Sequence, residues 1–395
     1  MKLLLVSHRF PWPLTRGDTL TVFKLAEHFS RRHEVDLLCH APQEPTDADR
    51  IRPLVRNLVC VPFSPAKAAG RLLAALPSRQ PLQVAWCGSG ELVRKARELC
   101  RRNEYDIALA YYVRTAEALR GVRAPAKVLA MQLAMSLQWR RSAERVRNPL
   151  KKLVRSLEAR RLRTYESKSF DLFDRCLLIS PADAEAIPGR VNEKIIYNPH
   201  GVDTERFRPD ASVQVEPKSI VFTGLMQFHP NADAICAFVR DSFPRLVQKV
   251  PEATLTIVGK NPPPAVRTLE KDPRITVTGT VPEIVPYLRR TAVAIAPIRI
   301  CAGLQNKVLE AMSTATATVI TSAANEGIDA TDGEHCLIRD DPAGFADAVV
   351  ELLKDDSRRE KMGRSARAWV QERWTWEYHF SRLESKLEAL VESKS

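Results

Sequence analysis

Two charged residues near an expected helix start have the types and the spacing to handle a phosphate ester. In the stretch from Pro297 to Ala317, P-I-R-I-C-A-G-L-Q-N-K-V-L-E-A-M-S-T-A-T-A, Lys307 and Glu310 are three residues apart. Residues at this spacing share one face of a helix. The ammonium group can meet a phosphate while the carboxylate accepts hydrogen bonds from hydroxyl groups. A solvated first helical turn with an ordinary glutamate is the alternative interpretation.

The elements around these two residues are those that present backbone N–H groups to an anion. The apolar run 293–296 predicts a buried strand that ends at Pro297. A loop of small residues follows, and helical spacing begins near Gln305. Because a strand, a tight turn and a helix start in a parallel α/β sheet leave N–H groups unpaired, we expect an anion to bind there.

Length and composition describe an ordinary globular protein with more than one core. The 395 residues exceed the usual size of a single domain, so two domains are expected. Hydrophobic residues make up 45% and charged residues 27%, which excludes a disordered chain. The formal net charge of +13 indicates an anionic partner, which could be a nucleoside diphosphate, an anionic membrane or nucleic acid.

The lack of a recognisable targeting signal and the pattern of cysteines favour a cytoplasmic protein. No stretch reaches about 18 uninterrupted apolar residues, so no transmembrane helix is predicted. The start, M-K-L-L-L-V-S-H-R-F-P, is interpreted as a first buried strand rather than a signal peptide. The eight cysteines include no C-x-x-C pair, which favours reduced thiols over metal ligands.

Alternating strands and helices predict an α/β fold with parallel sheets and right-handed crossovers. Apolar runs predict strands in the first half at 3–6, 35–39, 59–61, 107–110, 127–131, 176–179 and 195–197, and in the second half at 220–223, 254–258, 275–278, 293–296, 318–321 and 336–338. A segment rich in proline and polar residues interrupts the pattern. We therefore expect two doubly wound, Rossmann-like domains that face a cleft. The predicted parts are residues 1–197, a linker 198–217, residues 218–373, and a C-terminal helix 374–395 that packs back on the fold.

Six motifs in order resemble retaining glycosyltransferases of family 4, which have the GT-B fold. They are P-L-T-R-G-D-T-L, P-H-G-V-D-T-E-R-F-R-P, V-F-T-G-L-M-Q-F-H-P-N-A-D, G-T-V-P-E-I, G-L-Q-N-K-V-L-E-A-M and E-G-I-D-A-T-D-G-E-H-C-L-I-R-D-D-P. The resemblance covers nearly the whole chain and is greatest to the sugar transferases of exopolysaccharide and exosortase loci. It implies transfer of a sugar from a nucleoside-diphosphate sugar to a surface-polysaccharide or lipid-linked acceptor.

The resemblance also implies roles for particular residues. Lys307 and the helix dipole would stabilise the leaving diphosphate, and Glu310, the second glutamate of the E-x7-E motif, would bind the donor ribose. A glycine after the first strand would let the backbone of Gly17 and Asp18 approach the donor phosphates or the acceptor, and a turn that needs a positive φ is the alternative interpretation of that glycine. Neither a divalent metal nor a cofactor besides the donor is expected. The remaining expected donor contacts are Gly224, His229, Asn231, Val281, Gly303, Leu304, Gln305, Asn306 and Glu326.

The sequence departs from the family pattern in three segments. Ala302 stands where the first glutamate of E-x7-E contacts the transferred sugar, which puts the identity of that sugar in question. The family's G-R-L reads Gly224-Leu225-Met226, so Lys307 must supply the charge with help from Asn231 or His229. The segment L-A-M-Q-L-A-M-S-L-Q-W lacks the usual acidic or His-Asn pattern and keeps Ser136 and Trp139.

Two further residues follow strands that end at the expected cleft. His8 ends the first predicted strand, and Arg114 comes just after the strand 107–110. Either side chain could line the cleft, or it could be a structural residue of its own domain.

A basic segment indicates a further partner. Residues 140–163 hold ten Lys and Arg against two Glu, with an apolar stripe at Leu150, Leu153, Val154 and Leu157. Such a segment can seat a protein on an anionic membrane, at the inner face of the cell membrane where a polyprenyl-linked acceptor would lie. The alternative is a solvated helix whose stripe packs on its own domain.

Two other functions remain open from the sequence. A nucleotide-sugar epimerase or hydrolase would use the same fold, although K-V-L-E-A-M and the linker motif favour transfer. A catalytically weak relative could bind lipid or nucleic acid through its basic residues. No zinc-finger, RNP-like or helix-turn-helix pattern supports a nucleic-acid partner.

Overall fold

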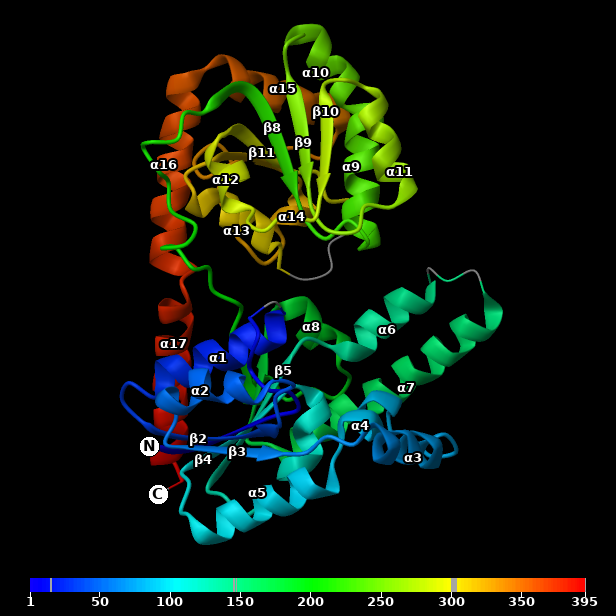
Figure 1. Ribbon diagram of the computed structural model, residues 1–395, viewed down its shortest axis with the longest axis vertical. Helices are drawn as coiled ribbons and strands as arrows, with labels where there is room; N and C mark the ends of the chain where they lie inside the picture. Colours follow the sequence, from blue (N-terminus) through cyan, green and yellow to red (C-terminus); the bar gives the residue numbers. More distant parts are fainter. Residues whose placement is uncertain (15, 145, 147, 300–303, 395) are drawn as a thin grey trace. The chain divides into compact units, whose positions relative to one another are not determined.

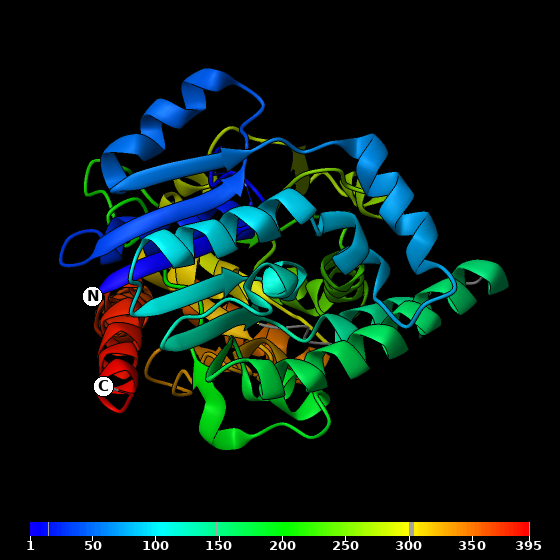
Figure 2. The ribbon, with the colours of Figure 1, turned by 90° about the horizontal axis from the view of Figure 1, so that it is seen from below.

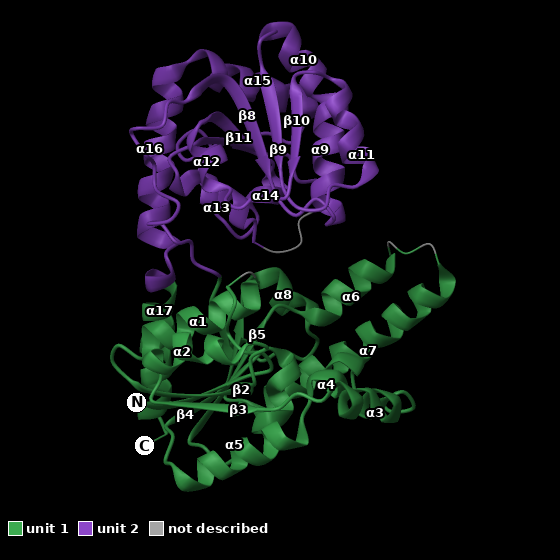
Figure 3. Cartoon of the chain, in the orientation of Figure 1, with its two compact units in different colours: residues 1–199, 379–395 green, residues 200–378 purple. Residues whose placement is uncertain are grey.

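The computed structural model describes residues 1–14, 16–144, 146, 148–299 and 304–394 and divides the chain into two compact units (Figure 3). The N-terminal unit comprises residues 1–199 and 379–395, and the C-terminal unit comprises residues 200–378. Each unit is built on one parallel sheet (Figure 1). The predicted class, α/β with two doubly wound domains, is therefore confirmed. Among the described residues, no helix is long and apolar enough to span a membrane.

The sheet of the N-terminal unit reverses its strand order between β1 and β4. Its described strands lie in the order β3-β2-β1-β4-β5-β6-β7. Leu3, Leu4, Leu5 and Val6 of β1 are all buried, because helices cover both faces, and this burial explains the continuous apolar run. The strands are β1 (Lys2–Ser7), β2 (Glu34–His40), β3 (Asn57–Val61), β4 (Ile107–Tyr111), β5 (Ala126–Gln132), β6 (Arg175–Leu178) and β7 (Ile195–Tyr197).

Helices of very different length surround this sheet. Figure 2 looks onto the face that α5 covers, where Leu92 and Ala96 pack with Leu4, Val6 and other strand residues. The helix α6 and the long helix α7 lie side by side (Figure 1). The helices are α1 (Gly17–Phe29), α2 (Ala48–Ile51), α3 (Pro65–Ala75), α4 (Leu82–Cys87), α5 (Gly90–Arg102), α6 (Met135–Glu144), α7 (Pro149–Leu172) and α8 (Pro181–Ala186).

The C-terminal unit repeats the same type of sheet, with the reversal between β8 and β11. Its described strands lie in the order β10-β9-β8-β11-β12-β13. They are β8 (Glu216–Thr223), β9 (Thr254–Val258), β10 (Ile275–Gly279), β11 (Thr291–Ala296), β12 (Ala317–Ile320) and β13 (Leu337–Ile338). The helices are α9 (His229–Asp241), α10 (Phe243–Lys249), α11 (Pro264–Arg267), α12 (Val285–Arg289), α13 (Asn306–Ser313), α14 (Ser322–Asn325), α15 (Pro342–Lys354) and α16 (Asp356–Arg373).

The boundaries of the two units differ from the predicted ones by a few residues. The division falls after Pro199 rather than after residue 197. Strand β8 begins at Glu216, inside the segment predicted to be linker, because the Glu216 N–H donates to the Arg290 carbonyl at 2.7 Å and extends the ladder. The last helix, α17 (Trp376–Glu392), contributes its residues from His379 onward to the N-terminal unit.

A buried carboxylate fixes α17 within the N-terminal unit. Glu384, which is 3% exposed, accepts hydrogen bonds from His28 Nε2 at 3.2 Å, His33 Nε2 at 2.7 Å and Arg32 Nη2 at 3.0 Å. Phe380 of the same helix packs against the His28 ring, with the centroids 5.5 Å apart. This helix is therefore held by a polar cluster as well as by its apolar stripe.

We predict that Glu384→Ala will destabilise the protein. Removing one member of a buried ionic cluster leaves its partners buried without a counterpart, which costs about 3 kcal/mol. A loss of this size should lower the melting temperature by roughly 6 °C or more, measured by circular dichroism. The matched control is Glu392→Ala, an exposed glutamate of the same helix. Equal melting temperatures for the two variants would contradict the role of the cluster.

Candidate functional site

The residues predicted to meet a phosphate gather where the strand order of the C-terminal sheet reverses. Gly224 directly follows β8, and Lys307 is in the first turn of α13, which comes after β11. Strands β8 and β11 are neighbours and parallel, so their carboxyl ends lie at the same edge. Open α/β sheets bind ligands at this switch point.

The ammonium group of Lys307 is held in a defined position. Lys307 Nζ donates a hydrogen bond to Asn231 Oδ1, and Asn231 Nδ2 donates to the Leu225 carbonyl at 3.0 Å. The ammonium also lies over the ring of Phe222, 4.9 Å from its centroid. A charge fixed by an amide and an aromatic face is preorganised to meet an anion, because it does not have to be reoriented when the anion binds.

Two glycines allow the backbone to come close to this lysine. A Cβ atom on Gly224 would lie 2.8 Å from Asn231 Nδ2 and 3.3 Å from Lys307 Nζ. A Cβ atom on Gly259, just after β9, would lie 1.7 Å from the Gly224 carbonyl oxygen. The turn after β8 therefore depends on glycine at both positions. Leu225, which stands at the position of the family's arginine, is 43% exposed.

Glu310 lies one helical turn beyond Lys307 on α13 and has an unusual environment. Burial raises the pKa of its carboxyl group to about 7, although Arg206 and Lys307 both act to lower it. Its carboxylate forms no hydrogen bond or ion pair with the residues that the structure describes. A partly buried carboxyl group with open acceptor positions suits the hydroxyl groups of a ligand.

Arg206 is a residue of this site that the sequence analysis did not single out. It acts electrostatically on Glu310, and its Nη2 forms an ion pair with Glu283 at 2.7 Å. Glu283 belongs to the loop after β10, which also contains Val281, a half-buried residue packed against the core of this unit. The motif P-H-G-V-D-T-E-R-F-R-P contains Arg206, but its interpretation as a linker gave this side chain no role.

The remaining predicted donor contacts have different surroundings. Leu304 and Gln305 are half-buried before α13, and Asn306 begins that helix. Gly303 and Ala302 lie outside the described residues. His229, the first residue of α9, and Glu326, which follows α14, are exposed. The structure therefore brings Gly224, Asn231, Lys307 and Glu310 together, whereas it gives no described contact between these four and His229 or Glu326.

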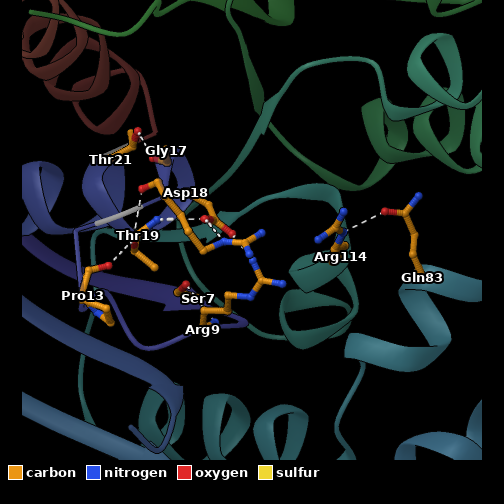
Figure 4. A network of polar contacts seen from close by, with 10 residues as sticks. Ser7, Arg9, Pro13, Gly17, Asp18, Thr19, Thr21, Gln83 and Arg114 are labelled. Atoms are coloured by element: carbon orange, nitrogen blue, oxygen red, sulfur yellow. Dashed lines mark hydrogen bonds and ion pairs between the residues drawn. The ribbon is translucent and has the colours of Figure 1, made fainter. Parts of the chain in front are cut away.

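Gly17 and Asp18 begin α1 in the N-terminal unit. Asp18 accepts a hydrogen bond from Arg9 Nη1 at 2.6 Å and one from Arg16 Nε at 3.2 Å (Figure 4). Burial acts to raise the pKa of Asp18, but the two guanidinium groups hold it below its usual value. Asp18 is therefore an ionised partner that positions two arginines.

A cavity of about 1320 Å³ lies in the N-terminal unit, and all of its lining residues belong to that unit. His8 and Arg9 follow β1, and Arg114 follows β4, so the cavity lies at the switch point of this sheet. Arg114 Nε donates to Gln83 Oε1 at 2.7 Å (Figure 4). Trp139 also lines the cavity.

Ser136, the other residue noted in the segment before Trp139, has a structural partner. Its Oγ donates a hydrogen bond to Glu166 at 2.5 Å, and both side chains are buried. Burial raises the pKa of Glu166 to about 7 despite these hydrogen bonds.

Among the described residues, one group has the side chains to hold a metal ion. Ligand atoms of His33, Glu384 and Glu388 lie within 4.8 Å of one another. Glu384 already accepts hydrogen bonds from three side chains that fix α17, so helix packing accounts for this group.

Comparisons with known proteins agree with this geometry. Residues 217–355 match the family model described as Glycosyl transferases group 1. The matched residues run from β8 to the end of α15 and include Gly224, Asn231, Lys307 and Glu310.

Curated relatives are distant. An uncharacterised 44.6 kDa protein of the cps region of Klebsiella pneumoniae is 22% identical and covers 97% of this chain and 98% of its own length. A GDP-mannose-dependent alpha-(1-6)-phosphatidylinositol monomannoside mannosyltransferase of Mycobacterium tuberculosis is 27% identical over 205 residues. That match covers 46% of this chain and 52% of the mycobacterial protein, so the chain spans about half the length of that relative.

Solved structures are similar over the whole chain. Sucrose-phosphate synthase of Thermosynechococcus elongatus has 15% identity and a TM-score of 0.70, and both chains are covered completely. HepE of Anabaena in complex with UDP-glucose has 13% identity and a TM-score of 0.66, with 98% of this chain and 100% of HepE covered. The chain therefore has the GT-B fold of these proteins, and its residues 217–355 form a domain of the Glycosyl transferases group 1 type.

Proposed function

We propose that the protein is a retaining glycosyltransferase that uses a nucleoside-diphosphate sugar and acts on a surface-polysaccharide or lipid-linked acceptor. The observation that carries the proposal is the ammonium group of Lys307, fixed by Asn231 beside the Gly224 backbone at the switch point of the sheet. The family model over this domain supports it. One relative is named a GDP-mannose-dependent mannosyltransferase, and one similar structure is that of HepE in complex with UDP-glucose. Both names support a nucleotide-sugar donor.

The proposed reaction needs stabilisation of a leaving group. When the bond between the anomeric carbon and the donor phosphate breaks, negative charge develops on the diphosphate. Lys307 and the N-terminus of α13 would face this charge in the transition state. Because these groups supply positive charge, the proposal requires no divalent metal.

The other donor contacts follow from the neighbours of Lys307. The open carboxylate of Glu310 would accept hydrogen bonds from the ribose hydroxyls, and the backbone near Val281 would meet the base. Retention and membership of family 4 rest on the resemblance of the six sequence motifs. The full-length relative from a cps region is consistent with a surface-polysaccharide acceptor.

We also propose that the N-terminal unit docks on an anionic membrane through α7 and the end of α3. Leu150, Leu153, Val154 and Leu157 are 45–69% exposed, so their own unit covers this apolar stripe only in part. Leu73 of α3 and Leu76, directly after this helix, are 66% and 52% exposed. Arg161 of α7 donates to the Leu76 carbonyl at 2.6 Å, which keeps the two helices together. Exposed apolar side chains among many cations match the surface of an anionic bilayer.

The role of Lys307 predicts a change in nucleotide affinity. We expect UDP or GDP to raise the melting temperature in EDTA, since a ligand at about 100 times its Kd adds about 2.7 kcal/mol. Lys307→Ala should weaken binding by about tenfold or more, because a hydrogen bond to a charged group contributes about 1.5–3 kcal/mol. Lys361→Ala, at an exposed position of α16, is the control. Unchanged affinity in Lys307→Ala, or binding that needs a divalent metal, would contradict the proposal.

The raised pKa of Glu310 predicts a pH-dependent affinity. Below pH 7 its carboxyl group becomes protonated and accepts hydrogen bonds less well. Nucleoside diphosphate affinity should therefore rise with pH between about 6 and 8 in the wild type and rise less in Glu310→Gln. Isothermal titration measures both proteins, and the titration of the diphosphate itself affects them equally. Parallel pH profiles would exclude contact between Glu310 and the ribose.

Docking on a membrane predicts binding that depends on charge and salt. Lys151→Glu together with Lys152→Glu should weaken binding to phosphatidylglycerol vesicles at low salt by about thirtyfold or more, measured by cosedimentation, since each basic residue near the surface contributes about 1 kcal/mol. The control variant carries the same charge change at Lys271 and Lys361, which are exposed in the C-terminal unit. Equal binding of both variants would contradict docking through α7.

Product analysis separates transfer from the alternative reactions. A glycosylated acceptor supports transfer, whereas release of the free sugar from the donor without a glycosylated product supports a hydrolase.

A further inference from the structure

The cavity of the N-terminal unit combines cationic and apolar walls. Arg9, Arg16 and Arg114 contribute guanidinium groups to it. Asp18 pairs with Arg9 and Arg16, but Arg114 forms no ion pair with a described residue. The guanidinium of Arg114 therefore keeps its charge available to an anion. Three carboxylates of described residues also line the cavity. Glu158 accepts hydrogen bonds from the backbone N–H groups of Leu82 and Gln83, at 2.9 Å and 3.1 Å. Glu44 and Asp47 lie in the segment after β2, and Asp47 ends a short 3-10 helix.

A buried histidine in the cavity wall has unused hydrogen-bonding capacity. His8 is 5% exposed, and neither of its ring nitrogens has a hydrogen-bond partner among the residues that the structure describes. Burial, Arg114 and Arg9 lower the pKa of His8 to about 3, so the ring is neutral and offers one donor and one acceptor. A buried polar group without a partner is costly, and a ligand hydroxyl group would satisfy it.

The apolar wall consists of aromatic side chains that remain partly exposed. Phe63 and Trp86 are 38% and 39% exposed, and their ring centroids are 6.1 Å apart. Leu72 of α3 lines the cavity, whereas Leu73 of the same helix and Leu76 directly after it are exposed to solvent. One helix therefore contributes to the cavity and to the surface proposed to contact the membrane.

We propose that this cavity binds the acceptor and that the acceptor is a lipid-linked phosphate or diphosphate sugar. This inference rests on the proposed glycosyltransferase function, because it names the acceptor class of that reaction. Arg114, with Arg9, binds the phosphate, and His8 binds a hydroxyl group of the sugar. Phe63, Trp86 and Leu72 contact the first part of the lipid chain, which leaves the cavity along α3.

The test uses the full chain with farnesyl diphosphate as the probe. Trp12, Trp86 and Trp139 line the cavity, so their fluorescence should change on binding. The titration is carried out in the Lys307→Ala variant, which weakens diphosphate binding at the proposed donor site, and a saturating UDP or GDP control accounts for what remains. Farnesol lacks the diphosphate group, and inorganic pyrophosphate lacks the isoprenoid chain. Each should therefore bind at least about tenfold more weakly than farnesyl diphosphate.

A pair of matched variants tests the cationic wall. Arg114→Gln, introduced into the Lys307→Ala chain, should weaken farnesyl diphosphate binding by about tenfold, as expected for loss of a charged hydrogen bond. Arg102→Gln removes an exposed arginine of α5 that does not line the cavity, and it should leave the affinity unchanged. Equal affinities of the two variants would overturn the assignment of the phosphate site.

A second pair of probes tests His8. Farnesyl phosphoryl glucose should bind more tightly than farnesyl phosphate, and His8→Phe should abolish this difference while it leaves the affinity for farnesyl phosphate unchanged. The phenyl ring is a flat ring somewhat larger than the imidazole, and it removes an unpartnered polar group from a wall that faces an open cavity, so the variant should fold. An undiminished difference in His8→Phe would overturn the role of His8.

The outcomes distinguish this inference from the proposed function. Pyrophosphate binding as tight as that of farnesyl diphosphate would overturn the lipid-linked acceptor in favour of a free phosphate ligand. Failure of every farnesyl probe to bind, with nucleotide binding intact in the wild type, would overturn this inference alone. Farnesyl diphosphate binding without any nucleotide binding would support the cavity and overturn the donor part of the proposed function.

Discussion

The hydrogen bond from Lys307 to Asn231 is the contact on which the candidate donor site depends. It joins the helix after β11 to the helix after β8, so it fixes a positive charge between the two strands where the order of the sheet reverses. The glycines after β8 and β9 let the backbone come close to this pair, because a Cβ atom at Gly224 would lie 2.8 Å from Asn231 Nδ2 and one at Gly259 would lie 1.7 Å from the Gly224 carbonyl oxygen. Glu310, one turn further along the helix, then presents an open carboxyl group beside two cations.

The two units have their candidate sites at the same point of the sheet, but the side chains at the two sites differ. In each sheet the strand order reverses beside the first strand, and polar residues follow the two strands that flank the reversal. The C-terminal unit gathers a lysine, an asparagine and a glutamate there, which suits a nucleotide. The N-terminal unit gathers a histidine and arginines beside an aromatic wall, which suits an amphipathic anion. This difference in side chains supports separate donor and acceptor roles.

The fold, and the grouping of Lys307 and Glu310 in the candidate donor site, could be predicted from the sequence, because their determinants are local. Buried strands appear as short apolar runs, and the spacing of Lys307 and Glu310 sets one face of α13. Residues distant in the chain were harder to connect. Arg206 acts electrostatically on Glu310 because of the course that the segment before β8 takes in space, which the sequence pattern does not reveal. The cavity of the N-terminal unit is lined by residues from several segments, and no single motif contains them. The strand β8 extends into the predicted linker because backbone pairing, unlike hydrophobic patterning, tolerates the polar Glu216.

A double-mutant cycle on nucleoside diphosphate affinity tests the central claim most directly. Isothermal titration would compare the wild type, Lys307→Ala, Asn231→Ala and the double variant with UDP or GDP, whichever binds more tightly. If Asn231 acts by holding the ammonium against the diphosphate, its removal weakens binding in the wild type but has little effect in Lys307→Ala, with a coupling of about 1 kcal/mol or more. Additive effects of the two substitutions would contradict the account, since the two side chains would then act independently.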